Sequence, residues 1–256
     1  KVTATFGPLI ENYYMLAATP SVYKPKVLKA FRFGGHGIAF GASTSVGMGL
    51  KYVGDNGFAT SLTANSKGGS DAAKGLFTEN DMNKVNLMGA YTGDNYHVSA
   101  TYTTQNTGFT SGYPYYSVVK NSGKDTTGWA LRGWWRPDEQ GTAIPSISVG
   151  FDTVAFSDVT DGFRDGEGYS IALNWTDMFQ ADDTIGVALG QPIKGSNHTT
   201  DGTASIDPFM WEAYYSFKPN DSIEVTPGIF GGSDLKDTST TNDNVFGFVV
   251  ATTFKF

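Results

Sequence analysis

The feature that most constrains this chain is an alternation of apolar and polar residues with a period of two, repeated from end to end. Successive side chains of a β-strand point to opposite faces of a sheet, so this pattern predicts strands with one apolar and one polar face. No long stripe with the 3.6-residue period of a helix accompanies it. The clearest case is 207–217, where one face carries Phe209, Trp211, Ala213, Tyr215 and Phe217 and the other carries Met210, Glu212, Tyr214 and Ser216. Twelve strands are predicted, at 1–7, 44–53, 57–66, 83–92, 96–105, 126–136, 144–154, 168–177, 184–190, 207–217, 222–231 and 245–256.

The connectors between these strands alternate strictly in length. Short turn sequences lie at 54–56, 93–95, 137–142, 178–183 and 218–221, and long polar loops lie at 8–43, 67–82, 106–125, 155–167, 191–206 and 232–244. A soluble β-sandwich has no reason to sort its connectors in this way, whereas outer-membrane barrels have short periplasmic turns and long external loops. We therefore predict an all-β fold, an antiparallel transmembrane β-barrel domain that spans residues 1–256.

The composition narrows the class of protein further. No stretch approaches the roughly 20 apolar residues of a membrane-spanning helix, which excludes a helical membrane protein. A hydrophobic content of 39% is compatible with a barrel, because only every second residue of a barrel strand faces lipid. The net charge of −7 argues against nucleic acid as a partner, since binding phosphate needs a basic surface. The chain contains no cysteine, which removes disulfides and thiolate metal sites.

Aromatic residues are placed as a membrane-spanning sheet requires. The last eleven residues, FGFVVATTFKF, end on a phenylalanine inside an alternating strand. Outer-membrane barrels carry girdles of aromatic side chains at both membrane interfaces. The residues predicted to form the girdle are Trp129, Trp135, Trp175, Trp211, Phe254 and Phe256. Charged residues of the predicted strands fall on the opposite, polar face, as they must if a Lys or Arg in the middle of the lipid face costs about 2–4 kcal/mol.

Several segments together resemble one known family. They are TATFGP and YMLAATPSVY within 3–23, LNWTDMF at 173–179, GVALGQP at 186–192, the run WEAYYSF to DSIEVTPGIF at 211–230, and the terminal VVATTFKF. This ordered set resembles the cyanobacterial outer-membrane porins, OprB-like barrels that are also called iron-uptake porins. The terminal aromatic residue of this chain, preceded by alternating hydrophobic residues, also resembles the signal that the barrel-assembly machinery of outer membranes reads.

The resemblance implies a passive channel in the bacterial outer membrane for small hydrophilic solutes and inorganic ions. It implies a homotrimer without a cofactor, in contact with outer-membrane lipid and lipopolysaccharide. It also implies about sixteen strands and an N-terminal surface-layer-homology domain that binds peptidoglycan. With twelve strands predicted in this chain, we expect that the first strands and the N-terminal domain are missing from it, and a genuine twelve-stranded barrel remains the alternative.

The longest loop, 8–43, carries a basic cluster in an otherwise acidic chain. The cluster consists of Lys24, Lys26, Lys29 and Arg32. Folded into the lumen, it would repel cations and attract anions at the constriction. Predicted wall charges extend this idea as two opposed strips, with Lys84, Arg132 and Arg136 facing Asp152, Glu212 and Glu224. The alternative is a solvated loop, or one that contacts lipopolysaccharide phosphates at the outer rim.

The sequence assigns no metal site and no catalytic site. Loop 155–167 contains Asp158, Asp161, Asp165 and Glu167, which suit Ca²⁺ as oxygen ligands but lack the spacing of an EF-hand. No zincin, nucleophile-elbow or P-loop motif occurs, so we predict that the protein is not an enzyme. A Ser–His pair assembled from distant strands stays open as an alternative.

Two other functions compete with a channel. One is a barrel that acts as a structural or adhesive anchor of the envelope, with its pore closed. The other is a soluble all-β carbohydrate-binding module whose exposed aromatic side chains stack on sugars. Detergent dependence separates the module from the two barrels, and single-channel conductance separates the channel from the anchor.

Overall fold

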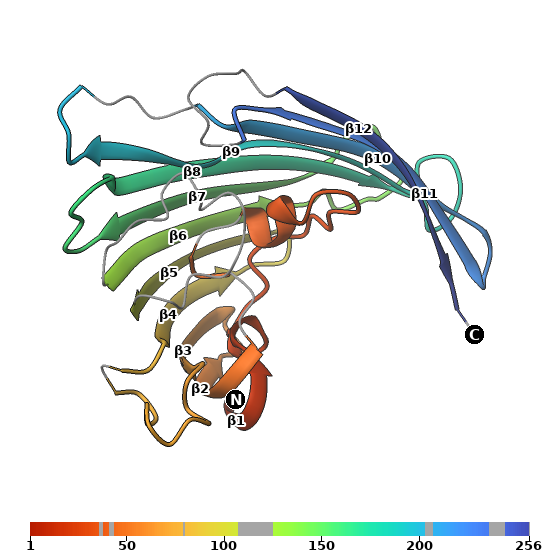
Figure 1. The fold of residues 1–256 in the computed structure, drawn as a ribbon. Coiled ribbons are helices and arrows are strands. Elements are labelled where there is room, and N and C mark those ends of the chain that lie inside the picture. The colour runs from red at the N-terminus through yellow and green to blue at the C-terminus, as the bar shows by residue number, and fades with distance from the viewer. Residues whose placement is uncertain are drawn as a thin grey trace.

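The computed structural model describes residues 1–35, 38–40, 44–78, 80–106, 125–202, 207–235 and 244–255. All twelve strands in these residues belong to one antiparallel sheet whose order in space follows the order in the chain (Figure 1). The strands are β1 (Val2–Glu11), β2 (Thr44–Val53), β3 (Phe58–Ser66), β4 (Asn83–Thr92), β5 (Tyr96–Asn106), β6 (Asp125–Trp135), β7 (Ser146–Phe156), β8 (Phe163–Thr176), β9 (Thr184–His198), β10 (Phe209–Asn220), β11 (Ile223–Ser233) and β12 (Val245–Phe254). Two short 3₁₀ helices, η1 (Asn12–Met15) and η2 (Lys29–Gly34), lie between β1 and β2. Among the described residues, none of the helices is long and apolar enough to cross a membrane.

The sheet is strongly curved, so it has a convex outer face and a concave inner face (Figure 1). Strands β1 and β12 are its two edges and do not pair with each other. An all-β, antiparallel, barrel-like fold was predicted, and the twelve strands and their antiparallel order confirm it.

Three predicted strands are too short. Strand β8 begins at Phe163 and pairs there with His198 of β9, so much of the predicted loops 155–167 and 191–206 is strand. At this end of the hairpin Arg164 and Glu167 are exposed, and the apolar alternation that reveals the rest of the strand is therefore absent. Strand β1 likewise continues past residue 7 to Glu11, with a register shift after Gly7. Residues 107–124 of the predicted loop 106–125, residues 236–243 of the loop 232–244, and Phe256 lie outside the described residues.

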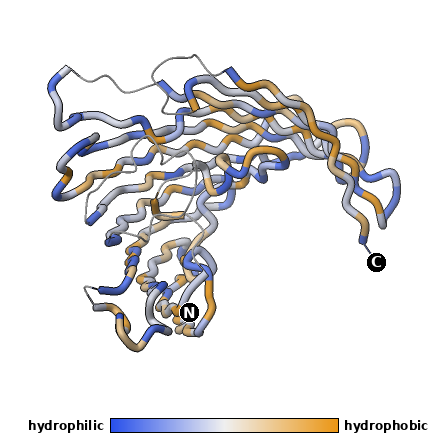
Figure 2. Tube along the Cα trace, viewed as in Figure 1, coloured by the Kyte–Doolittle hydropathy of each residue, from blue (hydrophilic) through white to orange (hydrophobic). Residues whose placement is uncertain are grey.

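Large apolar side chains stay exposed on strands from β1 to β12, and along these strands apolar residues alternate with polar ones (Figure 2). Directly paired residues of neighbouring strands point to the same face, so the register lines up the apolar residues in rows. One such row runs along Leu50, Leu62, Leu87, Tyr102 and Trp129. Large side chains of these rows stay exposed, and no second sheet in the described residues covers them.

The buried core lies on the concave face, between the wall and the chain that joins β1 to β2. Three apolar clusters form there, each with residues from that connecting chain and from the strands. They are Leu16, Ala39, Phe40, Ala59, Met88, Ala90 and Ala130; Tyr23, Ala30, Phe31, Ala172, Ala188, Met210 and Tyr214; and Ile38, Val154, Phe156, Phe163 and Ile193. Alternation predicts a polar concave face in contact with water. Instead, apolar residues of the strands pack there against apolar residues of the connecting chain.

Candidate functional site

The described residues 12–35 and 38–40, here called the inward segment, lie against the concave face of the sheet (Figure 1). Side chains on the wall bind its backbone along its length. The hydrogen bonds are Ala17 N to Ser61 Oγ at 3.1 Å, Trp134 Nε1 to Thr19 O at 3.2 Å, Val22 N to Ser148 Oγ at 3.2 Å, and Tyr214 OH to Lys24 O at 2.8 Å. The segment thus crosses the concave face from β3 to β10 as a docked element.

Glu212 of β10 is the most heavily used of these anchors. Its Oε1 accepts a hydrogen bond from the Tyr23 hydroxyl at 2.7 Å, and its Oε2 accepts from the backbone N–H groups of Val27, at 3.2 Å, and Leu28. Burial, together with the nearby Glu212 carboxylate, raises the pKa of Tyr23, so its hydroxyl stays a proton donor. Glu212 is fully buried under the inward segment. The prediction that it faces the open lumen is therefore wrong, since the segment covers it.

Arg132 of β6 and Asp152 of β7 form a second anchor. The guanidinium Nη2 lies 2.8 Å and 2.9 Å from the two carboxylate oxygens, and both side chains are buried. Arg132 Nε also donates to the carbonyl oxygen of Phe33 at 2.7 Å. These two charges lie on adjacent strands and neutralise each other, so the prediction that they belong to opposed strips across the lumen is wrong.

The segment approaches the wall most closely at Gly34 and Gly35, whose φ angles of +73° and +120° favour glycine. Ser170 Oγ donates to Gly34 O at 2.6 Å. A Cβ added to Gly150 of β7 would lie 1.6 Å from the same carbonyl oxygen. Only glycine at position 150 permits this contact.

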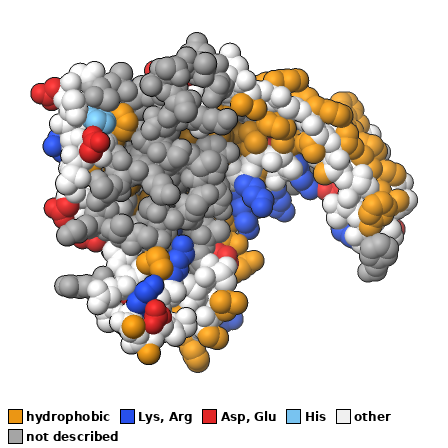
Figure 3. Space-filling model, viewed as in Figure 1, with side chains coloured by type: hydrophobic (Ala, Val, Ile, Leu, Met, Phe, Trp, Pro, Cys, Tyr) orange, Lys and Arg blue, Asp and Glu red, His pale blue; other side chains and the backbone are white. Residues whose placement is uncertain are grey.

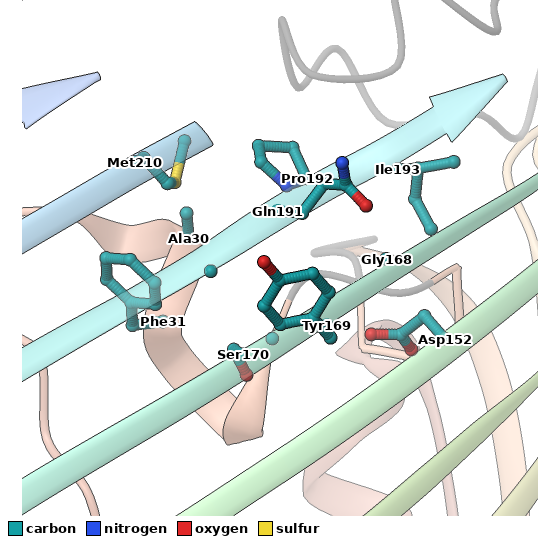
Figure 4. A pocket seen from close by; sticks show the side chains of 12 residues that line it. Ala30, Phe31, Asp152, Gly168, Tyr169, Ser170, Gln191, Pro192, Ile193 and Met210 are labelled. Atoms are coloured by element: carbon teal, nitrogen blue, oxygen red, sulfur yellow. The ribbon is translucent and has the colours of Figure 1, made fainter. Parts of the chain in front are cut away.

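A small cavity of about 20 Å³ remains where η2 meets β7 to β10 (Figure 4). Phe31 and Met210 lie at one end of it and the Asp152 carboxylate at the other. Because Asp152 is already paired with Arg132, this pocket offers no free charge to a solute.

The four predicted basic residues of the loop, Lys24, Lys26, Lys29 and Arg32, are all exposed. Lys and Arg side chains gather in the hollow of the sheet (Figure 3). Lys26 forms an ion pair with Glu224 of β11 at 2.5 Å, which offsets its charge. Within the described residues, Lys24, Lys29 and Arg32 form no ion pair. The concave face therefore carries unpaired positive charge at the inward segment.

The remaining predicted wall cations take other positions. Lys84 is buried and donates to the carbonyl oxygen of Ile38, so the segment covers it. Arg136 follows the end of β6, where its Nη2 donates to Asp94 O at 3.0 Å and its guanidinium stacks over Trp134. Neither extends a basic strip along the open part of the concave face.

A polar pocket of about 330 Å³ lies beside the basic residues, at the end of the sheet where β8 turns into β9. Lys24 and Lys26 line it together with two residues that the sequence analysis missed, Asp182 and Lys218, which pair at 2.8 Å. The hydrogen bond from Lys218 holds the pKa of the Asp182 carboxyl below its usual range. In this pocket Lys24, which has no ion pair among the described residues, therefore lies near two ion pairs, Lys26–Glu224 and Lys218–Asp182.

Five of the six predicted girdle residues lie on the convex face, and the sixth, Phe256, is outside the described residues. Trp129 and Trp135 are exposed, on one face of β6. Six residues of strand separate them by about 20 Å along the strand, which is about 15 Å across the membrane at the roughly 35–45° tilt of barrel strands and so less than the roughly 25 Å height of the apolar band. Trp175 and Trp211 are half-buried on the same face, and Phe254 is exposed.

The four carboxylates considered for Ca²⁺ are not assembled. Asp165 and Glu167 lie on β8 and not in a loop, and Asp165 accepts a hydrogen bond from Asn197 Nδ2. Asp158 and Asp161 precede β8. Across the described ranges, no three His, Cys, Asp or Glu side chains come together as a metal site would require.

Comparisons with known proteins complete the description. No protein-family profile matches the chain, and no curated protein matches it. Among solved structures, OmpF of Salmonella typhi in a complex with daunomycin is similar, with a TM-score of 0.52 and 13% identity. The match covers 82% of this chain and spans 62% of the length of that chain. The likeness is one of fold, and it shows that the curved sheet described above is porin-like.

Proposed function

We propose that this chain forms the wall of a passive outer-membrane channel for small hydrophilic solutes and inorganic ions. The observation that carries the proposal is the convex face, whose rows of Leu, Phe, Tyr and Trp have no protein partner in the described residues. The accessible surface of 13204 Å² exceeds the about 11,000 Å² expected of a compact soluble protein of this mass. An apolar convex face with a charged concave face suits a sheet that separates lipid from water.

The proposed selectivity is for anions. Lys24, Lys29 and Arg32 place unpaired positive charge at the inward segment, and Lys26 contributes less because Glu224 offsets it. In a narrow passage with walls of low dielectric constant, such charges raise the local concentration of anions and lower that of cations.

Finer features follow from the segments that resemble the cyanobacterial OprB-like porins. We propose that further strands complete the ring between β1 and β12, and that three copies of the protein assemble. We also propose contacts with lipid and lipopolysaccharide around the barrel, and a tether to peptidoglycan through an N-terminal domain.

Reversal potentials test the anion preference. The purified protein is reconstituted in a planar lipid bilayer under a KCl gradient, and the wild type is compared with the double variant Lys24→Gln and Lys29→Gln. We expect the double variant to shift the reversal potential away from the chloride equilibrium potential, because two unpaired cations are lost. Lys194→Gln is the matched control, since Lys194 pairs with Asp207 outside the inward segment.

Other outcomes select between the alternatives. A protein that inserts into bilayers without conducting is the structural or adhesive anchor. A protein that stays monodisperse without detergent is the soluble carbohydrate-binding module. An unchanged reversal potential in the double variant contradicts the proposed selectivity alone.

A further inference from the structure

Arg32 is held differently from the other exposed cations of the inward segment. Its guanidinium carbon lies 4.8 Å from the centroid of the Tyr13 ring and 4.6 Å from that of the Phe33 ring. Stacking on aromatic faces leaves the N–H groups at the edge of the guanidinium free to bind a ligand. Since no carboxylate in the described residues pairs with it, Arg32 is an oriented and unused donor.

The wall fixes the aromatic side of this arrangement. Phe33 has a φ angle of +60°, which is uncommon for a bulky residue. The hydrogen bond from Arg132 Nε to its carbonyl oxygen holds it there, and Asp152 holds Arg132 in turn. A strained backbone that its surroundings enforce is a common feature of binding sites, because it sets side chains in place before the ligand arrives.

An open groove of about 400 Å³ lies beside Arg32. Tyr13, Tyr14 and Phe33 line it as a continuous aromatic surface, with ring centroids 4.7 Å apart for the two tyrosines and 5.1 Å apart for Tyr13 and Phe33. Lys51 of β2 supplies a second cation, and no carboxylate takes part in the lining. The groove therefore combines aromatic ring faces, tilted by 51° and 45° to one another, with net positive charge.

We propose that this groove is a subsite for an organic oxyanion with a flat apolar body, such as an aromatic carboxylate. Arg32 donates two in-plane N–H groups to the carboxylate oxygens, Lys51 adds attraction, and the ring of the solute packs against the tyrosines. Paired hydrogen bonds of this kind are stronger and more directional than those of lysine. The inference rests on the proposed channel, because the solute reaches the groove from the concave face.

Block of the chloride current by benzoate tests the subsite. We expect benzoate to reduce the current at concentrations where acetate and inorganic phosphate do not. In Arg32→Lys the half-blocking concentration should rise about tenfold, as expected for the loss of one charge-assisted hydrogen bond. Arg136→Lys makes the same chemical change at an arginine stacked over Trp134, outside the groove, and should leave the block unchanged.

Phe33→Leu is a second variant, which removes one of the two rings that contact Arg32. It should also weaken the block by benzoate. If one variant misfolds, the other still tests the subsite. Equal block of the wild type and Arg32→Lys, or acetate as effective as benzoate, overturns the subsite. Calorimetric titration of benzoate into the protein in detergent separates the two proposals. Binding without any conductance refutes the channel and keeps the subsite, whereas conductance without binding or block refutes the subsite alone.

Discussion

Replacing Gly150 with alanine measures how firmly the inward segment is docked on the wall. The new Cβ would lie 1.6 Å from Gly34 O and 2.8 Å from the carbonyl carbon of the same residue. Because non-bonded carbon and oxygen atoms need about 3.3 Å, the backbone of the segment must move away by roughly 1.5–2 Å. The adjacent hydrogen bonds, from Arg132 to Phe33 at 2.7 Å and from Ser170 to Gly34 at 2.6 Å, do not survive such a shift.

The size of the effect follows from these two hydrogen bonds. One involves a charged donor, worth about 1.5–3 kcal/mol, and the other is neutral, worth about 1 kcal/mol, so docking weakens by about 2.5–4 kcal/mol. At 1.4 kcal/mol per factor of ten, the population of the undocked segment rises roughly a hundredfold or more. Trypsin reports this population, because Lys26 and Lys29 lie in the segment, neither is followed by proline, and cleavage follows opening.

Limited trypsin digestion of the folded protein in detergent is the assay, read as the rate of cleavage at those two lysines. Gly89→Ala is the control, because a Cβ on Gly89 meets no atom within 4 Å. We expect fast cleavage and a noisier single-channel current in Gly150→Ala only. Cleavage at the wild-type rate in Gly150→Ala would refute the docking geometry.

Three further changes test other parts of the structure. In Glu212→Gln, an amide NH₂ group can face the two backbone N–H groups from which the carboxylate accepts hydrogen bonds in the wild type. We therefore expect faster trypsin cleavage of the inward segment. An unchanged rate would contradict the anchoring role of Glu212. Leu131→Arg on the convex face should destabilise the protein in lipid vesicles by about 2–4 kcal/mol in urea unfolding, whereas a neutral result is what an exposed position in water predicts. In the turn before β9, burial alone would raise the pKa of the Asp183 carboxyl, but hydrogen bonds from three backbone N–H groups and the Tyr215 hydroxyl lower it below its usual range. A carboxyl whose pKa is lowered in the folded state stabilises the protein above the unfolded-state pKa of about 3.9, and this stability is lost as the pH falls through the folded-state pKa. Asp183→Asn should therefore reduce the drop in thermal stability between pH 7 and pH 3. An equal drop in the wild type and the variant would contradict the assignment.

The fold is written in the sequence because alternation is a local property. One row of paired residues contains Leu87, Tyr102 and Trp129. The alternation along its own strand indicates which face of the sheet each of these residues occupies. The register then follows, because a shift by one residue would move apolar side chains to the polar face. The same logic fails at the Phe163 end of β8, because Arg164 and Glu167 are exposed there and interrupt the apolar alternation.

The sequence also drew attention to Lys24, Lys26, Lys29 and Arg32, since a basic cluster stands out in an acidic chain without any knowledge of its surroundings. Lys26 pairs with Glu224, which is 198 positions away in the chain, and no local pattern encodes such a partner. Glycine within the strand at Gly150 was the available hint of a close backbone approach.

Only the tertiary structure decided which charges remain free. Arg132 and Asp152 neutralise each other, Glu212 accepts hydrogen bonds from backbone N–H groups, and Arg32 lies over two aromatic rings without an ion pair among the described residues. The charge of a residue follows from its type and can be read from the sequence. Whether that charge is compensated depends on a second residue that folding brings next to it, so it can be known only from the tertiary structure.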